Sequence, residues 1–103
     1  MRVTVTARHC SITPTLRERA KVVMARLGQL TPFGQEATVV FDAEGERPAV
    51  EIRLHLSGGT VLIAESAAVD HRTALDRAER KVRRQLERPM AKPSRRRGST
   101  RKT

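Results

Sequence analysis

The spacing of apolar residues changes along this chain, and those changes predict the order of its secondary structure. Val3, Val5 and Ala7 alternate with polar residues, which is the two-residue period of a half-buried strand. From residue 14 the apolar positions recur every three or four residues, as they do in an amphipathic helix. Strand-like sequence returns after residue 36, and a second helical repeat follows residue 70. We therefore predict the element order β-α-β-β-β-α.

Each predicted helix begins at a residue that can cap it. Thr13 can cap a helix over residues 14–29, because its hydroxyl oxygen can accept a hydrogen bond from the first helical turn. Asp70 can cap the second helix in the same way. That helix should end near Arg88, because Pro89 disfavours helical geometry in the residue before it.

Three strands are predicted between the helices, at residues 37–42, 48–56 and 60–66. The last two are joined by a hairpin turn at residues 57–59, since the two glycines there accept the positive φ angles of tight turns. Consecutive strands with short links are most simply antiparallel, whereas the first strand follows a helical crossover and can lie parallel to its neighbour. The predicted fold class is a two-layer α+β sandwich, a four-stranded sheet with both helices on one face.

The charge of the chain indicates a polyanionic partner. Its 103 residues, enough for one domain, hold 21 Lys and Arg against 11 Asp and Glu, a net charge of +10. Residues 89–103 contain six basic residues and no acid, and we expect them to form a basic disordered tail after a folded domain at residues 1–88. No membrane anchor or secretory signal is recognisable, so we expect a cytoplasmic protein that binds nucleic acid and not a membrane.

The second predicted helix carries the strongest binding signal. Its apolar residues fall within a sector about 80° wide on a helical wheel, and its arginines cluster on the opposite side. Cations repeat every 4.5 to 6 Å along such a stripe, at about 1.5 Å per residue, which suits contact with successive phosphates. The first helix repeats this pattern more weakly, and the two helices together would form one basic ridge. The candidate RNA contacts on this argument alone are Arg77, Arg80 and Arg88.

No catalytic or metal site is expected. His9, His55 and His71 are scattered without metal-ligand spacing, and Cys10 has no partner cysteine. The turn at Gly58 lacks the pattern of a phosphate-cradling loop. We therefore expect neither an enzyme nor a cofactor, and no small-molecule substrate.

Three segments resemble the ribosome hibernation promoting factor family in its short form, also called ribosome-associated inhibitors or sigma-54 modulation proteins. Arg8 to Glu18 is similar to the strand-to-helix opening of that family, with an Ile-Thr pair before Leu-Arg-Glu, and His55 to Gly59 resembles its hairpin. The second helix follows the family's spacing without a gap. Its matching residues are Asp70, Ala74, Leu75, Asp76, Ala78, Lys81, Arg84, Gln85 and Leu86.

The resemblance implies a double-stranded-RNA-binding-domain-like fold and a translation inhibitor. Proteins of this family bind the small ribosomal subunit and its rRNA near the decoding centre and mRNA channel, and they silence translation in stationary phase or stress. Their RNA contacts match Lys21, Arg26, Lys81 and Arg84 in this sequence. Because the dimerisation domain of the long form has no counterpart here, we expect a monomer off the ribosome.

Two other functions remain open at this point. One is a protein–protein modulator of transcription, as the sigma-54 name suggests, which would need an apolar anchor on the surface. The other is a generic nucleic-acid-binding protein that acts mainly through its basic tail.

Overall fold

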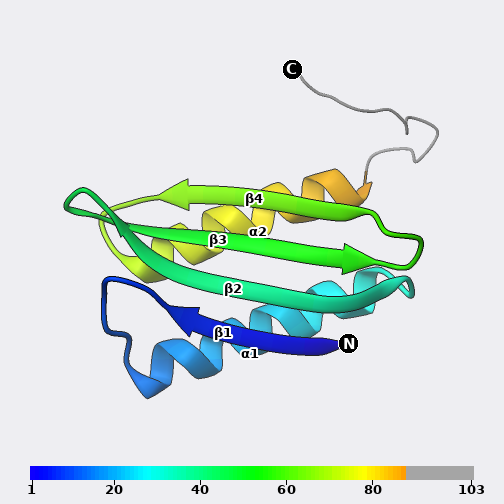
Figure 1. The fold of residues 1–103 in the computed structure, drawn as a ribbon, viewed down its shortest axis with the longest axis horizontal. Helices are drawn as coiled ribbons and strands as arrows, with labels where there is room; N and C mark the ends of the chain where they lie inside the picture. Colours follow the sequence, from blue (N-terminus) through cyan, green and yellow to red (C-terminus); the bar gives the residue numbers. More distant parts are fainter. Residues whose placement is uncertain (88–103) are drawn as a thin grey trace.

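The computed structural model describes residues 1–87 and confirms the predicted order of elements (Figure 1). Arg88 and the predicted tail at residues 89–103 lie outside the described residues. The elements are β1 (Arg2–Ala7), α1 (Pro14–Leu30), β2 (Gly34–Glu44), β3 (Arg47–Leu56), β4 (Val61–Ala67) and α2 (His71–Glu87).

The four strands form one sheet in the order β1-β2-β3-β4. β1 runs parallel to β2, and the pairs β2–β3 and β3–β4 are antiparallel. Both helices lie on the same side of this sheet, behind the strands in Figure 1, with α1 against β1 and β2 and α2 against β3 and β4. The predicted two-layer α+β sandwich is therefore confirmed, including the parallel first strand.

The second strand begins earlier than its apolar pattern indicates. β2 starts at Gly34, three residues before the start predicted at residue 37. Its first residues are polar and carry no alternation, but Gly34 pairs with Leu56 across a bulge in the β2–β3 ladder. The partner strand extends β2 by backbone hydrogen bonding, which apolar periodicity does not report.

The core fills the space between the sheet and the two helices. Val39, Ile52 and Ala64 form one cross-strand row on the inner face, and all three are buried. Phe41 is fully buried in the next row, where its ring meets the imidazole of His71 edge-on at 5.5 Å between ring centres. This contact joins the end of β2 to the first residue of α2, and it helps to fix where α2 lies on the sheet.

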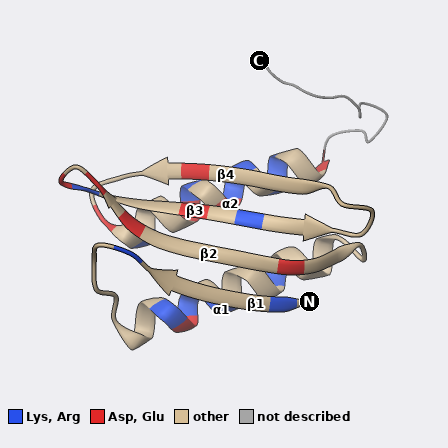
Figure 2. Ribbon diagram, viewed as in Figure 1, with Lys and Arg blue, Asp and Glu red and all other residues tan. Residues whose placement is uncertain are grey.

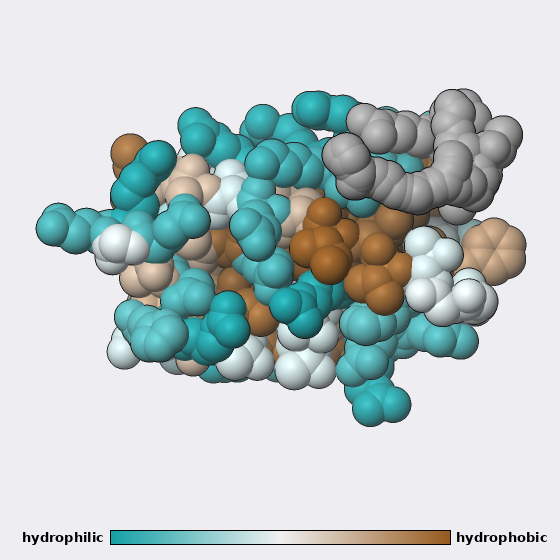
Figure 3. Space-filling view, turned by 45° about the horizontal axis from the view of Figure 1, so that its top comes forward, coloured by the Kyte–Doolittle hydropathy of each residue, from teal (hydrophilic) through white to brown (hydrophobic). Residues whose placement is uncertain are grey.

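The open face of the sheet carries a mixture of charged and apolar side chains. Val61 and Ile63 of β4 are 41% and 48% exposed, although they belong to a regular strand. Figure 3 shows apolar side chains gathered near the middle of the molecule, with hydrophilic side chains around them.

Both predicted helix caps are present. The Thr13 side-chain oxygen accepts a hydrogen bond from the backbone N–H of Leu16 at 3.0 Å. Asp70 Oδ1 accepts one from the backbone N–H of Thr73 at 2.7 Å. Hydrogen bonds from Thr73 hold the pKa of Asp70 below its usual range, because they favour the ionised carboxylate.

The Asp70 cap predicts a component of acid sensitivity. A pKa that is lower in the folded state gives stability that is fully present above the unfolded-state pKa of about 4 and is lost as the pH falls through the folded-state value. We expect Asp70→Asn, which keeps a capping side chain but cannot titrate, to lose stability less steeply below that pH. Urea denaturation over a pH series measures this, and identical slopes for variant and wild type would contradict it.

Candidate nucleic-acid interface

The amphipathic character of α2 decides which of its side chains face outward. Ala74, Leu75, Ala78 and Val82 are buried against the sheet. Arg77, Arg80, Lys81 and Arg84 are exposed. The helix is therefore apolar on the side that packs and cationic on the side that faces solvent, as its sequence predicts.

The cations of α2 line an open hollow between the helix and the end of β4, about 540 Å³ in volume. Of the residues that the structure describes, five cations and two small residues form its walls, and no carboxylate does. The lining residues are Arg47, Ser66, Ala67, Arg77, Arg80, Lys81 and Arg84. An anion in this hollow would meet positive charge from several directions.

Two of the three acids of α2 are engaged on the other flank of the helix, and the third, Glu87, is its last residue. Asp76 pairs with Arg19 of α1 at 3.2 Å, and Glu79 pairs with Arg83 one turn further along α2. None of the ion pairs within residues 1–87 involves Arg77, Arg80, Lys81 or Arg84. The outward charge of α2 is therefore not neutralised by any acid in this part of the chain.

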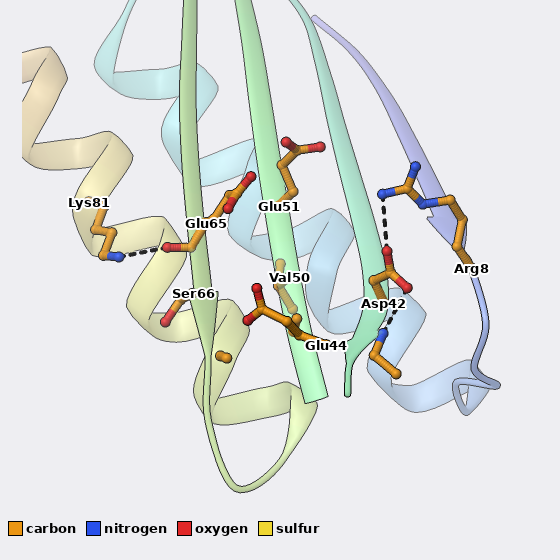
Figure 4. Close-up of a pocket in the computed structure, with 11 residues that line it drawn as sticks. Arg8, Asp42, Glu44, Val50, Glu51, Glu65, Ser66 and Lys81 are labelled. Atoms are coloured by element: carbon orange, nitrogen blue, oxygen red, sulfur yellow. Dashed lines mark hydrogen bonds and ion pairs between the residues drawn. The ribbon is translucent and has the colours of Figure 1, made fainter. Parts of the chain in front are cut away.

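Lys81 is held at the edge of the sheet. Its Nζ donates a hydrogen bond to the carbonyl oxygen of Glu65 on β4 at 2.6 Å (Figure 4). Gln85 Nε2 donates to Ile63 O on the same strand at 3.1 Å. An ammonium group has three N–H donors, so Lys81 keeps two for an anion in the hollow.

The opposite edge of the sheet is covered in the same manner. Arg17 of α1 donates from Nη1 to the carbonyl oxygen of Val5 on β1 at 2.9 Å. Exposed strand edges offer unpaired backbone groups to other chains, and side chains that occupy these groups oppose such pairing. Side chains of α1 and α2 thus occupy carbonyl groups of both edge strands.

The two predicted contacts on α1 lie on different flanks of that helix. Arg26 is seven residues after Arg19, or about two turns, so it lies on the flank that faces α2. Lys21 is four residues after Arg17 and lies on the β1 flank, where it pairs with Glu18 at 3.3 Å. The structure therefore places Arg26 on the side of α1 that faces Asp76 and Lys21 on the opposite side, and neither lines the hollow with the α2 cations.

Arg47 is a member of this cationic group that sequence reasoning missed. It is the first residue of β3 and lies thirty residues before Arg77 in the chain. In the sequence it directly follows the turn that holds Glu44 and Glu46, where it resembles an ordinary surface charge. The register of the β3–β4 hairpin could have revealed it. Counting residue pairs back from the turn places the start of β3 beside Ala67, close to the start of α2.

The open side of the sheet has the opposite charge at the same end of the molecule. A groove of about 380 Å³ lies there, and its carboxylates come from Asp42, Glu44, Glu51 and Glu65 (Figure 4). Hydrogen bonds from the Ala43 backbone and the His9 side chain, together with the nearby Arg8, hold the pKa of Asp42 below its usual range. Figure 2 shows this division, with much of the positive charge on the helices and acids on β2, β3 and β4.

The described part of the chain lacks the features of two other kinds of site. Within residues 1–87, no three His, Cys, Asp or Glu side chains group closely enough to hold a metal ion. No helix of this part of the chain is both long and apolar enough to cross a membrane.

A basic α+β sandwich whose helix carries cations unpaired within residues 1–87 is typical of small domains that bind nucleic acid. The chain is a member of the family described as Sigma 54 modulation protein / S30EA ribosomal protein, whose profile matches residues 3–93. This match confirms the family resemblance found in the sequence. None of the curated proteins compared matches the chain significantly.

Two solved structures share the fold. The N-terminal domain of Protein Y from Thermus thermophilus is 28% identical, with a TM-score of 0.73, and the match covers 84% of this chain and 97% of that one. A ribosomal subunit interface protein from Coxiella burnetii has a TM-score of 0.79 and covers 89% of this chain and 100% of its own. Its sequence is 22% identical to this chain, and at that identity the similarity shows a shared fold alone.

Proposed function

We propose that this protein is a ribosome hibernation factor. In this proposal it binds small-subunit rRNA near the decoding centre and mRNA channel, and it blocks the binding of mRNA and tRNA in stationary phase or stress. The observation that carries the proposal is the group of α2 cations without acidic partners among residues 1–87. Family membership and the subunit-interface and Protein Y relatives support the ribosome as the source of the RNA.

The inhibitor would act by occupying space and not by chemistry. Arg77, Arg80, Lys81 and Arg84 would contact phosphates of folded rRNA, and Arg26 would add a contact from the flank of α1 that faces α2. The body of the domain would then fill the path of mRNA and tRNA. We propose that Lys21 adds a contact from the far flank of α1, and that Arg88 and residues 89–103 add positive charge after the folded domain.

Such a protein would act in the cytoplasm without a cofactor or turnover. We further propose that it is a monomer off the ribosome. The occupied carbonyl groups on β1 and β4 support this, because they oppose pairing of two sheets through their edges.

The salt dependence of ribosome binding tests the proposal. Each phosphate contact should contribute about 0.7 to 0.9 to the fall of log affinity with log salt, so the four exposed cations of α2 predict a slope of roughly 3 or steeper. Sedimentation of the purified protein with isolated small subunits, over a series of salt concentrations, measures this slope.

The controls in this experiment are large subunits and unrelated duplex DNA. Preferential binding to small subunits with a steep slope is the expected result. A flat slope would contradict an interface made of phosphate contacts, and equal binding to duplex DNA would indicate a generic nucleic-acid-binding protein instead. Capture of RNA polymerase after nuclease treatment, without ribosome binding, would favour a transcription modulator.

A further inference from the structure

The hollow beside α2 receives guanidinium groups from two separate elements. Arg47 comes from the start of β3, and its Nη2 lies 3.5 Å from the carbonyl oxygen of Ala67. Arg77, Arg80 and Arg84 line the same hollow from α2. The contact of Arg47 with Ala67 is long for a hydrogen bond, so the guanidinium keeps most of its donor capacity for a ligand.

We infer that this hollow is a phosphate-binding site in which Arg47 and α2 together hold phosphate groups of an RNA backbone. The inference rests on the proposed function and deepens it, since it names a site and a residue outside the helices. A guanidinium is planar and can donate two parallel hydrogen bonds to two oxygens of one phosphate. Arg47 on one side and Arg77 on the other could therefore bind the same or successive phosphates.

Small residues line the sheet side of the hollow and leave room for such a group. Ser66 pairs with Val50 in the β3–β4 register, and because Val50 is buried in the core, Ser66 also lies on the helical side of the sheet. Its hydroxyl is a hydrogen-bond donor suited to a phosphate oxygen. Ala67 adds only a methyl group, so a phosphate can approach the end of β4 closely.

The charge on the other side of β4 restricts the approach of an anion. Glu65 and Glu51 lie opposite each other in the sheet register and line the acidic groove on the open face. A phosphate is repelled from the acidic groove and attracted into the hollow beside α2. The groove and the hollow nevertheless share Ser66, Ala67 and Lys81 as lining residues. The end of β4 thus marks a boundary between a repulsive and an attractive surface.

Contact from a second element also limits how the protein can lie on RNA. Cations on a single helix allow the domain to rock about the helix axis while each phosphate contact is kept. Arg47 is displaced from α2 toward the sheet, so a contact made there fixes this rotation. We therefore expect Arg47 to determine the orientation of the bound domain as well as to add affinity.

The test compares two arginines of β3 in the full chain. Arg47→Gln and Arg53→Gln remove the same charge, but Arg53 lies on the open face beside Glu51 and does not line the hollow. We expect Arg47→Gln to weaken binding to isolated small subunits about tenfold and to lower the salt slope by about 0.7 to 0.9, and Arg53→Gln to leave both within error. Arg47→Lys, which keeps the charge and loses the planar fork, should fall between wild type and Arg47→Gln.

Inorganic pyrophosphate provides a readout that does not depend on the ribosome. Titration of the wild-type protein should shift the backbone amide resonances of Ser66 and Ala67, and Arg47→Gln should abolish these shifts. Equal loss of small-subunit affinity in Arg47→Gln and Arg53→Gln, with Ser66 and Ala67 resonances unmoved by pyrophosphate, would overturn the inference and leave the proposed function standing. A wild-type protein that binds pyrophosphate at the hollow but does not bind small subunits would overturn the ribosomal function and, with it, RNA as the ligand of this site.

Discussion

Reversal of two charges in Arg77→Glu/Arg84→Glu is expected to weaken small-subunit binding by about a hundredfold or more. Both residues line the hollow, and neither is paired with an acid in residues 1–87. Each substitution removes a charged contact with phosphate and adds repulsion, and contacts of this kind are worth about 1.5 to 3 kcal/mol each. Both side chains are exposed on the outer side of α2, so the fold should persist. Co-sedimentation on sucrose gradients, with circular dichroism to check the fold, measures the effect.

The matched control places the same charge change on the other side of the sheet. Arg2→Glu/Arg53→Glu also lowers the net charge by four, but both residues are exposed away from α2 and outside the hollow. It should weaken binding only through long-range attraction, by a few-fold at moderate salt. Equal losses in the two double variants would mean that net charge alone drives binding. If Arg77→Glu/Arg84→Glu still binds small subunits, residues 89–103 make the main contribution to binding. Deletion of that segment would then abolish binding.

Truncation of Phe41 is expected to remove most of the stability of the domain. Phe41 is fully buried, and its ring contacts His71 at the start of α2. Phe→Ala substitutions at such positions cost about 3 to 5 kcal/mol, because they remove buried apolar surface and leave a cavity. Domains of this size are stable by about 5 to 15 kcal/mol, so Phe41→Ala should lower the urea midpoint greatly or unfold much of the protein.

Phe33 provides the control, since it and Phe41 are the two aromatic residues of the chain apart from histidine. Phe33 follows α1 and is 62% exposed. Phe33→Ala should change the free energy of unfolding by no more than about 0.5 kcal/mol. Similar destabilisation by both variants would show that the Phe41 ring does not hold α2 on the sheet. Ribosome binding by Phe41→Ala should be lost only in proportion to the fraction unfolded.

The charge division within the fold explains how so small a domain could present one face to a polyanion. Asp76 of α2 turns toward α1, Glu79 pairs along the helix, and the acids of the sheet gather on its open face. This leaves the outer side of α2 and the start of β3 with free positive charge. Such an arrangement steers association by orientation as well as by attraction.

The candidate binding site could be predicted from sequence only where it follows a helical period. Arg77, Arg80 and Arg84 share one side of α2 because a helix repeats every 3.6 residues, and the sequence alone places them there. Lys21 seemed part of the same surface because its helix also carries a basic side. Its actual place on the β1 flank depends on how α1 is rotated against the sheet, which is set by packing between elements.

Local sequence patterns are enough to predict the element order, the buried side of each helix and the two capping residues, and the total charge predicts a polyanionic partner. Each of these features depends on neighbours within a few residues or on total charge, and both can be read directly from the amino-acid sequence. The three-dimensional structure was needed to show that β2 begins at Gly34, that Lys81 covers the edge of β4 and that Arg47 joins α2 around one hollow. These features depend on strand register and helix docking, which bring together residues far apart in sequence through contacts that no local period encodes.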